Sequence, residues 1–143
     1  MINIRAFVIA FSLIIFSVTL QAEIPSEKQI EEWQRLYPKL NSKMARMEEL
    51  LNYIDRFLGD AEFKKPMLSK AVEFTYLAEA SLLNIPKELP KEQIEPFKKA
   101  LIKVSKLGRD LHLAIQEDRI KDVQQCFKKL DEIRRKSHSD WVF

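Results

Sequence analysis

Apolar residues recur along this chain with alternating spacings of four and three, the repeat of a helix that buries one face. The stretch from 40 to 58 carries this repeat without interruption. After the first 22 residues, no segment alternates apolar and polar side chains for long enough to indicate a strand. The whole chain has only two glycines, Gly59 and Gly108. The sequence therefore predicts an all-α protein.

Four stretches carry such a stripe, and short connections between them favour an up-down-up-down antiparallel four-helix bundle. In this arrangement the start of the first helix and the end of the fourth lie at the same end of the bundle. The side chains expected to point into the core are Leu40, Met44, Met47, Leu51, Ile54 and Leu58, then Met67, Ala71, Phe74, Ala78 and Leu82, then Phe97, Leu101, Val104, Gly108, Leu111 and Ile115, and finally Ile120, Val123, Phe127 and Leu130.

Glycine and proline mark several helix ends. Gly59 stands where a left-handed residue would end the first helix. The second helix begins either at Asp60, a good cap, or near Pro66, which suits a first turn. We expect Pro96 in the opening turn of the third helix. Gly108 lies on a core stripe, which indicates either space for a bound group or a tight contact between helices.

An N-terminal helical extension is expected over residues 23–38, because the apolar stripe continues backwards through Trp33. Ser26 and Gln29 have the spacing of a capping box at its start. Pro38 removes one backbone hydrogen bond and crowds the preceding turn, so it predicts a kink or a break before the bundle.

Residues 1–22 have the pattern of a signal peptide. Arg5 precedes an apolar stretch over 6–20 that is short for a membrane span, and small residues lead up to a cleavage site before Glu23. A retained N-terminal anchor is the alternative. We therefore expect an exported protein in which residues 39–143 form the bundle domain.

The charge pattern argues against nucleic-acid and membrane-surface partners. The formal net charge is only +3, and both signs alternate along the helical faces, as on a solvated surface. Cys126 is the single cysteine, so no internal disulfide forms, and its place beside an apolar stripe indicates a buried small side chain rather than a catalyst. His112 adjoins the third stripe, and we expect it at the surface or the boundary of the core.

Continuing the fourth stripe past Leu130 gives Arg134, His138 and Trp141, so the core there becomes basic and aromatic. The predicted topology brings His138 and Met44 to the same end of the bundle. A thioether and an imidazole on opposite sides of one cavity are a ligand pair for haem iron. Periodicity alone fits ordinary roles equally well, because methionine fills cores and histidine is favoured at helix C-termini.

The final stretch, RIKDVQQCFKKLDEIRRKSHSDW over residues 119–141, resembles the last helix of the soluble cytochrome b562 family, including Leu130, Arg134 and His138. The similarity continues back through Phe97 and Leu101. Residues 40–44 resemble the first turns of that family, where its methionine ligand lies. The resemblance covers about residues 39–141.

This resemblance implies a non-covalent haem b (iron protoporphyrin IX) as cofactor. Residues 134–137 contain no cysteine where related covalent cytochromes carry Cys-x-x-Cys, so thioether attachment is not expected. The implied site places Met44 and His138 as axial iron ligands, Phe97 and Leu101 along the ring, and Arg134 near the haem edge or a propionate.

Three points qualify the comparison with the family. Met47, one turn after Met44 and also inward, is the alternative sulfur ligand. Ser137 replaces a tyrosine of the family, and Val142 stands near the place of a late arginine.

The N-terminal extension has no counterpart in familiar members of the family. We expect Trp33 and Tyr37 to cover Trp141 and the mouth of the haem site, shielding the iron from water.

The function implied by the resemblance is a monomeric periplasmic one-electron carrier that serves an unidentified redox partner protein and is not an enzyme. The alternative is a haem-free periplasmic helical bundle with a structural or partner-binding role. A transition-metal site on His138 is a third interpretation, although one histidine without nearby inward carboxylates makes a poor metal cage.

Overall fold

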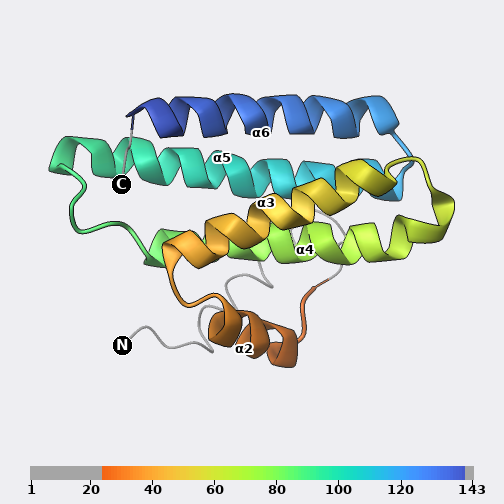
Figure 1. Ribbon diagram of the computed structural model, residues 1–143, viewed down its shortest axis with the longest axis horizontal. Helices are drawn as coiled ribbons and strands as arrows, with labels where there is room; N and C mark the ends of the chain where they lie inside the picture. Colours follow the sequence, from red (N-terminus) through yellow and green to blue (C-terminus); the bar gives the residue numbers. More distant parts are fainter. Residues whose placement is uncertain (1–23, 141–143) are drawn as a thin grey trace.

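The structure, a computed structural model, describes residues 24–140, and all regular elements in that range are helical. The all-α prediction is confirmed. The leader at 1–22 and the positions Trp141 and Val142 lie outside the described residues. The helices are α2 (Glu27–Leu36), α3 (Leu40–Phe57), α4 (Lys64–Ala80), α5 (Lys91–Gln116) and α6 (Ile120–Asp140), with 3-10 turns η1 (Ala61–Phe63) and η2 (Ser81–Leu83) (Figure 1).

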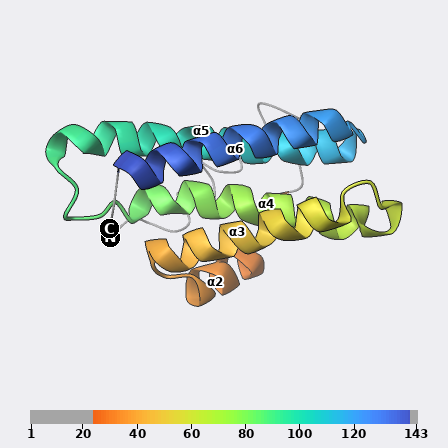
Figure 2. The same ribbon diagram turned by 45° about the horizontal axis from the view of Figure 1, so that its top comes forward.

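The long helices α3 to α6 follow one another with a reversal of direction at each connection (Figure 1). Close packing joins α3 to α4, α4 to α5, and α5 to α6. The short helix α2 lies on the side of α3 and α4 that faces away from α6, as two views agree (Figures 1 and 2). Comparably close packing does not join α3 to α6 in the described range, and a seam that holds a cavity lies between these two helices.

The ends of the first two helices follow the sequence signals. Ser26 Oγ accepts a hydrogen bond from the Gln29 amide at 3.2 Å, and Gln29 Oε1 accepts one from the Ser26 amide at 2.9 Å, so the predicted capping box is confirmed. Pro38 lies between α2 and α3, so the chain forms two separate helices there and not one kinked helix. Gly59 has a φ of 86°, the left-handed conformation predicted for the residue that follows the helix.

Asp60 and Pro66, the two predicted starts of the second helix, each lie at the start of a different helical element, Asp60 at η1 and Pro66 at α4. The Asp60 side chain accepts a hydrogen bond from the Glu62 amide at 3.1 Å and caps η1. Helix α4 follows directly from η1, with Pro66 in its first turn, where the missing N–H has no partner to lose.

Helix α4 is the most buried element. Residues 71–78 are buried without interruption, as expected for a helix covered on all sides. Its polar groups have partners: Thr75 Oγ1 donates to the Ala71 carbonyl at 2.9 Å, and Glu73 Oε1 lies 2.8 Å from Arg46 Nε of α3. The side of α4 facing α2 contributes Tyr76, whose ring centroid lies 5.2 Å from that of Trp33.

At Gly108 the backbone of α5 lies close to α4. A Cβ atom there would lie 3.0 Å from Phe74 Cδ1 and 3.3 Å from Thr75 Cα. Of the two interpretations of this glycine, the tight helix contact is therefore correct.

The sequence predictions for Pro96, Ile120 and His112 are wrong. Pro96 lies inside α5, which begins earlier at Lys91; the loss of one exposed backbone hydrogen bond near the helix start is tolerated there because water can serve the freed carbonyl. Ile120, the first residue of α6, is exposed because the helix begins beyond the core. His112 is buried, since α5 packs against both α4 and α6.

Substitution of Gly108 by alanine tests the α4–α5 contact. At an open helix position this change stabilises by about 0.5–1 kcal/mol. Here we expect a loss of about 1–3 kcal/mol, because the added methyl group has no space beside the backbone of Thr75. Urea unfolding measures the difference, with Lys106→Ala on the exposed face of α5 as a control that stays within about 0.5 kcal/mol. An unchanged or higher stability of Gly108→Ala would contradict the contact.

Candidate functional site

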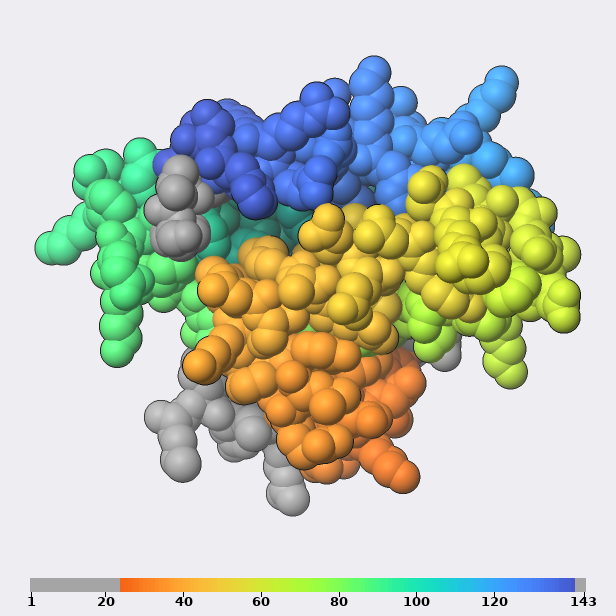
Figure 3. All heavy atoms as spheres, in the orientation of Figure 1, coloured from red at the N-terminus to blue at the C-terminus, as the bar shows by residue number. Residues whose placement is uncertain are grey.

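A cavity of about 550 Å³ lies in the seam between α3 and α6, within the usual range of about 300–1,000 Å³ for ligand pockets. In the space-filling view a hollow separates the side chains of α3 from those of α6, with atoms of α5 at its floor (Figure 3). Most of its wall is apolar. The lining consists of Met44, Ala45, Met47, Glu48, Leu51, Asn52 and Asp55 of α3, Phe74 of α4, Phe97, Ala100, Leu101 and Val104 of α5, and Phe127, Leu130, Asp131, Ile133, Arg134, Ser137 and His138 of α6.

All the site residues expected from the sequence line this one cavity. They are Met44, Phe97, Leu101, Arg134 and His138, and the alternative sulfur donor Met47 lines it too.

The degree to which these residues are covered differs from the prediction. Phe97, Leu101 and Met47 are buried, whereas Met44 is 36% exposed and His138 is exposed. Met44 and His138 are therefore less covered than the apolar stripes suggested, although both line the cavity. They point into a cavity that is open to solvent, because α3 and α6 do not pack closely against each other along this seam.

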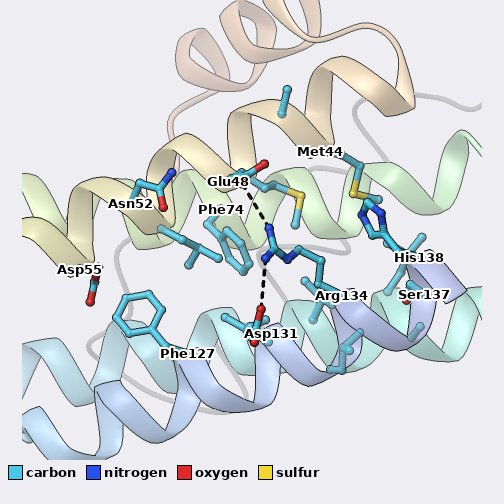
Figure 4. A pocket seen from close by; sticks show the side chains of 18 of the residues that line it. Met44, Glu48, Asn52, Asp55, Phe74, Phe127, Asp131, Arg134, Ser137 and His138 are labelled. Atoms are coloured by element: carbon cyan, nitrogen blue, oxygen red, sulfur yellow. Dashed lines mark hydrogen bonds and ion pairs between the residues drawn. The ribbon is translucent and has the colours of Figure 1, made fainter.

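Met44 and His138 point toward each other from opposite walls at one end of the cavity (Figure 4). Met44 lies one turn into α3, whose start is fixed by Ser42 Oγ accepting from the Lys39 amide at 3.1 Å. His138 lies near the end of the described part of α6. The alternating directions of the helices bring the thioether and the imidazole to the same level.

Lys43 fixes the turn of α3 that carries Met44. Its Nζ donates to Asn84 Oδ1 at 2.7 Å, which ties α3 to the residue that follows η2. Lys43 is buried, and desolvation lowers the pKa of its ammonium group below the ordinary value of 10.5. The start of α3 is thus attached to the end of the α4 segment by a buried polar contact.

The lowered pKa of Lys43 makes the stability of the protein depend on pH in the alkaline range. Between its folded pKa and 10.5, the unfolded chain binds more protons at this side chain, so stability conferred by Lys43 rises with pH. We expect wild-type protein to gain stability relative to Lys43→Met on going from pH 7 to pH 10, as measured by urea unfolding at both values. A difference that stays constant or falls would contradict the desolvation of this group.

Arg134 spans the cavity toward α3. Its Nη1 lies 3.2 Å from Glu48 Oε1 across the seam, and its Nη2 lies 3.2 Å from Asp131 Oδ1 on its own helix (Figure 4). The sequence analysis did not single out Glu48 or Asp131. Helical spacing could have found both, since Glu48 follows Met44 by one turn and Asp131 precedes Arg134 by three residues.

Acidic groups outnumber basic ones along the cavity. Among the lining residues within 24–140, Glu48, Asp55 and Asp131 contribute carboxylates, whereas Arg134 is the one lysine or arginine. Hydrogen bonds from Arg135 and Arg134 lower the pKa of Asp131, so this carboxylate is ionised at neutral pH. Any anionic group of a ligand therefore has Arg134 as its charged partner and Glu48 as its neighbour.

The expectation that Trp33 and Tyr37 cover the mouth of this site is wrong. Trp33 is buried against Tyr76 of α4, and the Tyr37 ring centroid lies 5.8 Å from the Arg46 guanidinium carbon. Neither residue lines the cavity. The physical reason is that α4 presents apolar surface on its side facing away from α6, and α2 covers that surface. Trp141, which they were expected to cover, lies outside the described residues.

Truncation of Trp33 distinguishes packing against α4 from the expected covering of the cavity mouth. Trp33→Ala should lower the free energy of unfolding by about 3 kcal/mol, because it leaves a large gap against Tyr76. The NMR resonances of the His138 ring should not move, because no residue of α2 is among those that line the cavity. Leu36→Ala, on the exposed face of the same helix, is the control and should change stability by less than about 0.5 kcal/mol. A shift of the His138 signals in Trp33→Ala would restore the covering role.

Other chemistry in the described range is limited. Cys126 is buried, as expected, and burial raises the pKa of its thiol. Residues 24–140 contain no cluster of three or more His, Cys, Asp or Glu side chains suited to a metal ion. No helix in that range is long and apolar enough to span a membrane.

The chain matches no family model, no curated protein and no solved structure. The resemblance of residues 39–141 to the b562 cytochromes therefore stays a prediction from the sequence.

Proposed function

We propose that this protein binds haem b non-covalently between α3 and α6, with Met44 and His138 as axial ligands, and acts as a periplasmic one-electron carrier. In this proposal α3 to α6 form an up-down-up-down antiparallel four-helix bundle over residues 39–143, and α2 is an N-terminal extension. The observation that carries the proposal is that Met44 and His138 line opposite walls of one cavity at the same level.

The chemistry of the donor set fits this group. A thioether and a neutral imidazole are a known axial pair for low-spin haem iron. The walls between them are mainly aromatic and aliphatic, which suits the apolar faces of a porphyrin. Phe97 and Leu101 lie on the α5 side, and Arg134 provides a cation for a carboxylate.

Met44 and His138 would together hold the iron, so a carrier would need no free coordination site and no catalytic base. When bound, haem would supply the exchange of one electron between ferrous and ferric iron. The chain would contribute ligation, orientation and an apolar surface for the porphyrin. Its redox partner would be another protein, and export rests on the predicted leader at 1–22.

Optical spectra test the proposal. Haem added to the purified protein should give a sharp Soret peak and sharp reduced-state bands, and both Met44→Ala and His138→Ala should lose the low-spin spectrum. His112→Gln is the control, since His112 does not line the cavity, and should keep it. Loss of the bands in Met47→Ala but not in Met44→Ala would identify Met47 as the sulfur ligand.

A protein that gives no Soret peak at stoichiometric haem would contradict the proposal. The alternative, a haem-free helical bundle with a structural or partner-binding role, would then be favoured.

A further inference from the structure

We propose that Glu48 competes with a carboxylate of the bound ligand for the guanidinium of Arg134, and so determines how strongly the cavity prefers an anionic ligand. The inference rests on the proposed haem site, because haem carries two carboxylates. It concerns Glu48, a residue of α3 that the resemblance does not assign to the site.

Glu48 occupies the position at Arg134 that a carboxylate of the ligand would take. Arg134 Nη1 lies 3.2 Å from Glu48 Oε1, and this pair crosses the seam between the two helices that flank the cavity (Figure 4). Both residues line the cavity. A group that occupies the space between α3 and α6 therefore meets the pair directly.

The ion pair between Arg134 and Glu48 is weak enough for a ligand carboxylate to replace Glu48. The side chains of Arg134 and Glu48 are 58% and 61% exposed, so solvent screens their attraction. Asp131 is a second partner of Arg134, also at 3.2 Å, and it stands on the same helix three residues earlier. Arg134 thus keeps one carboxylate contact when Glu48 is displaced, and its guanidinium stays at the cavity.

Displacement of Glu48 from Arg134 affects the binding of charged and neutral ligands differently. A ligand carboxylate gains Arg134, but it must displace Glu48 and then lies close to a like charge. A neutral ester of the same shape gains less from Arg134, because its oxygens are weaker hydrogen-bond acceptors than a carboxylate, and it is not repelled by Glu48. The ratio of the two affinities consequently reports on Glu48, while general effects on folding cancel.

Metal-free protoporphyrin IX and its dimethyl ester are suitable probes, because they differ in their carboxylates and need no iron ligand. Fluorescence titration of the full chain gives both dissociation constants. We expect Glu48→Gln to raise the preference for the diacid by about two- to fivefold, the range of an exposed ion pair. Arg134→Gln should lower that preference, and in the double variant Glu48→Gln should have a smaller effect than in the wild type, because only its repulsion of the ligand carboxylate is then removed.

Glu49→Gln is the matched control. It removes the same charge from the next residue, but Glu49 pairs with Arg46 at 3.0 Å and does not line the cavity. Its preference for the diacid should equal that of the wild type. The inference is overturned if Glu48→Gln leaves the preference unchanged, if Glu49→Gln raises it equally, or if neither porphyrin binds.

Failure of the proposed function would look different. Porphyrin binding with the expected effect of Glu48→Gln, together with the absence of a low-spin spectrum on adding haem, would refute ligation by Met44 and His138 and support the exchange at Arg134.

Discussion

The burial of α4 on all sides is the constraint on which the rest of the arrangement depends. Residues 71–78 have no exposed face, so α4 needs neighbours in every direction. Helices α3 and α5 cover two sides, with α5 brought against the α4 backbone at Gly108, and α2 covers a third through Trp33. Helix α6 packs on α5 instead. The seam between α3 and α6 is left open as a result, and the cavity lies there.

The sequence predicted those features that depend on local physics. The spacing of apolar residues predicted the helices, Ser26 and Gln29 predicted a capping box, and Gly59 predicted a left-handed residue, because each of these depends on a few neighbouring residues. The five site residues predicted from the sequence line one cavity in the structure. Stripe positions and alternating helix directions together determine which side chains lie at the same level. Whether they hold haem stays a prediction.

The position of α2 and the open seam between α3 and α6 could not be predicted from the sequence, because both depend on contacts between distant segments. The place of α2 is determined by packing of Trp33 on Tyr76 and by the Arg46–Glu73 ion pair beneath Tyr37, which join residues far apart in the chain. The open seam could not be read from stripes either, because a stripe shows which face of a helix is apolar and not how closely its neighbour approaches. For this reason Met44 is more exposed than its periodicity suggested.

The buried thiol of Cys126 has a practical consequence for work on the cavity. A thiol with little exposure and a raised pKa is mostly protonated at neutral pH and reacts slowly with alkylating reagents. Cysteines introduced on the outer faces of α3 and α6 would therefore take up spin labels selectively, without replacement of the native residue. The separation of the two helices becomes measurable by electron paramagnetic resonance in an otherwise unaltered chain.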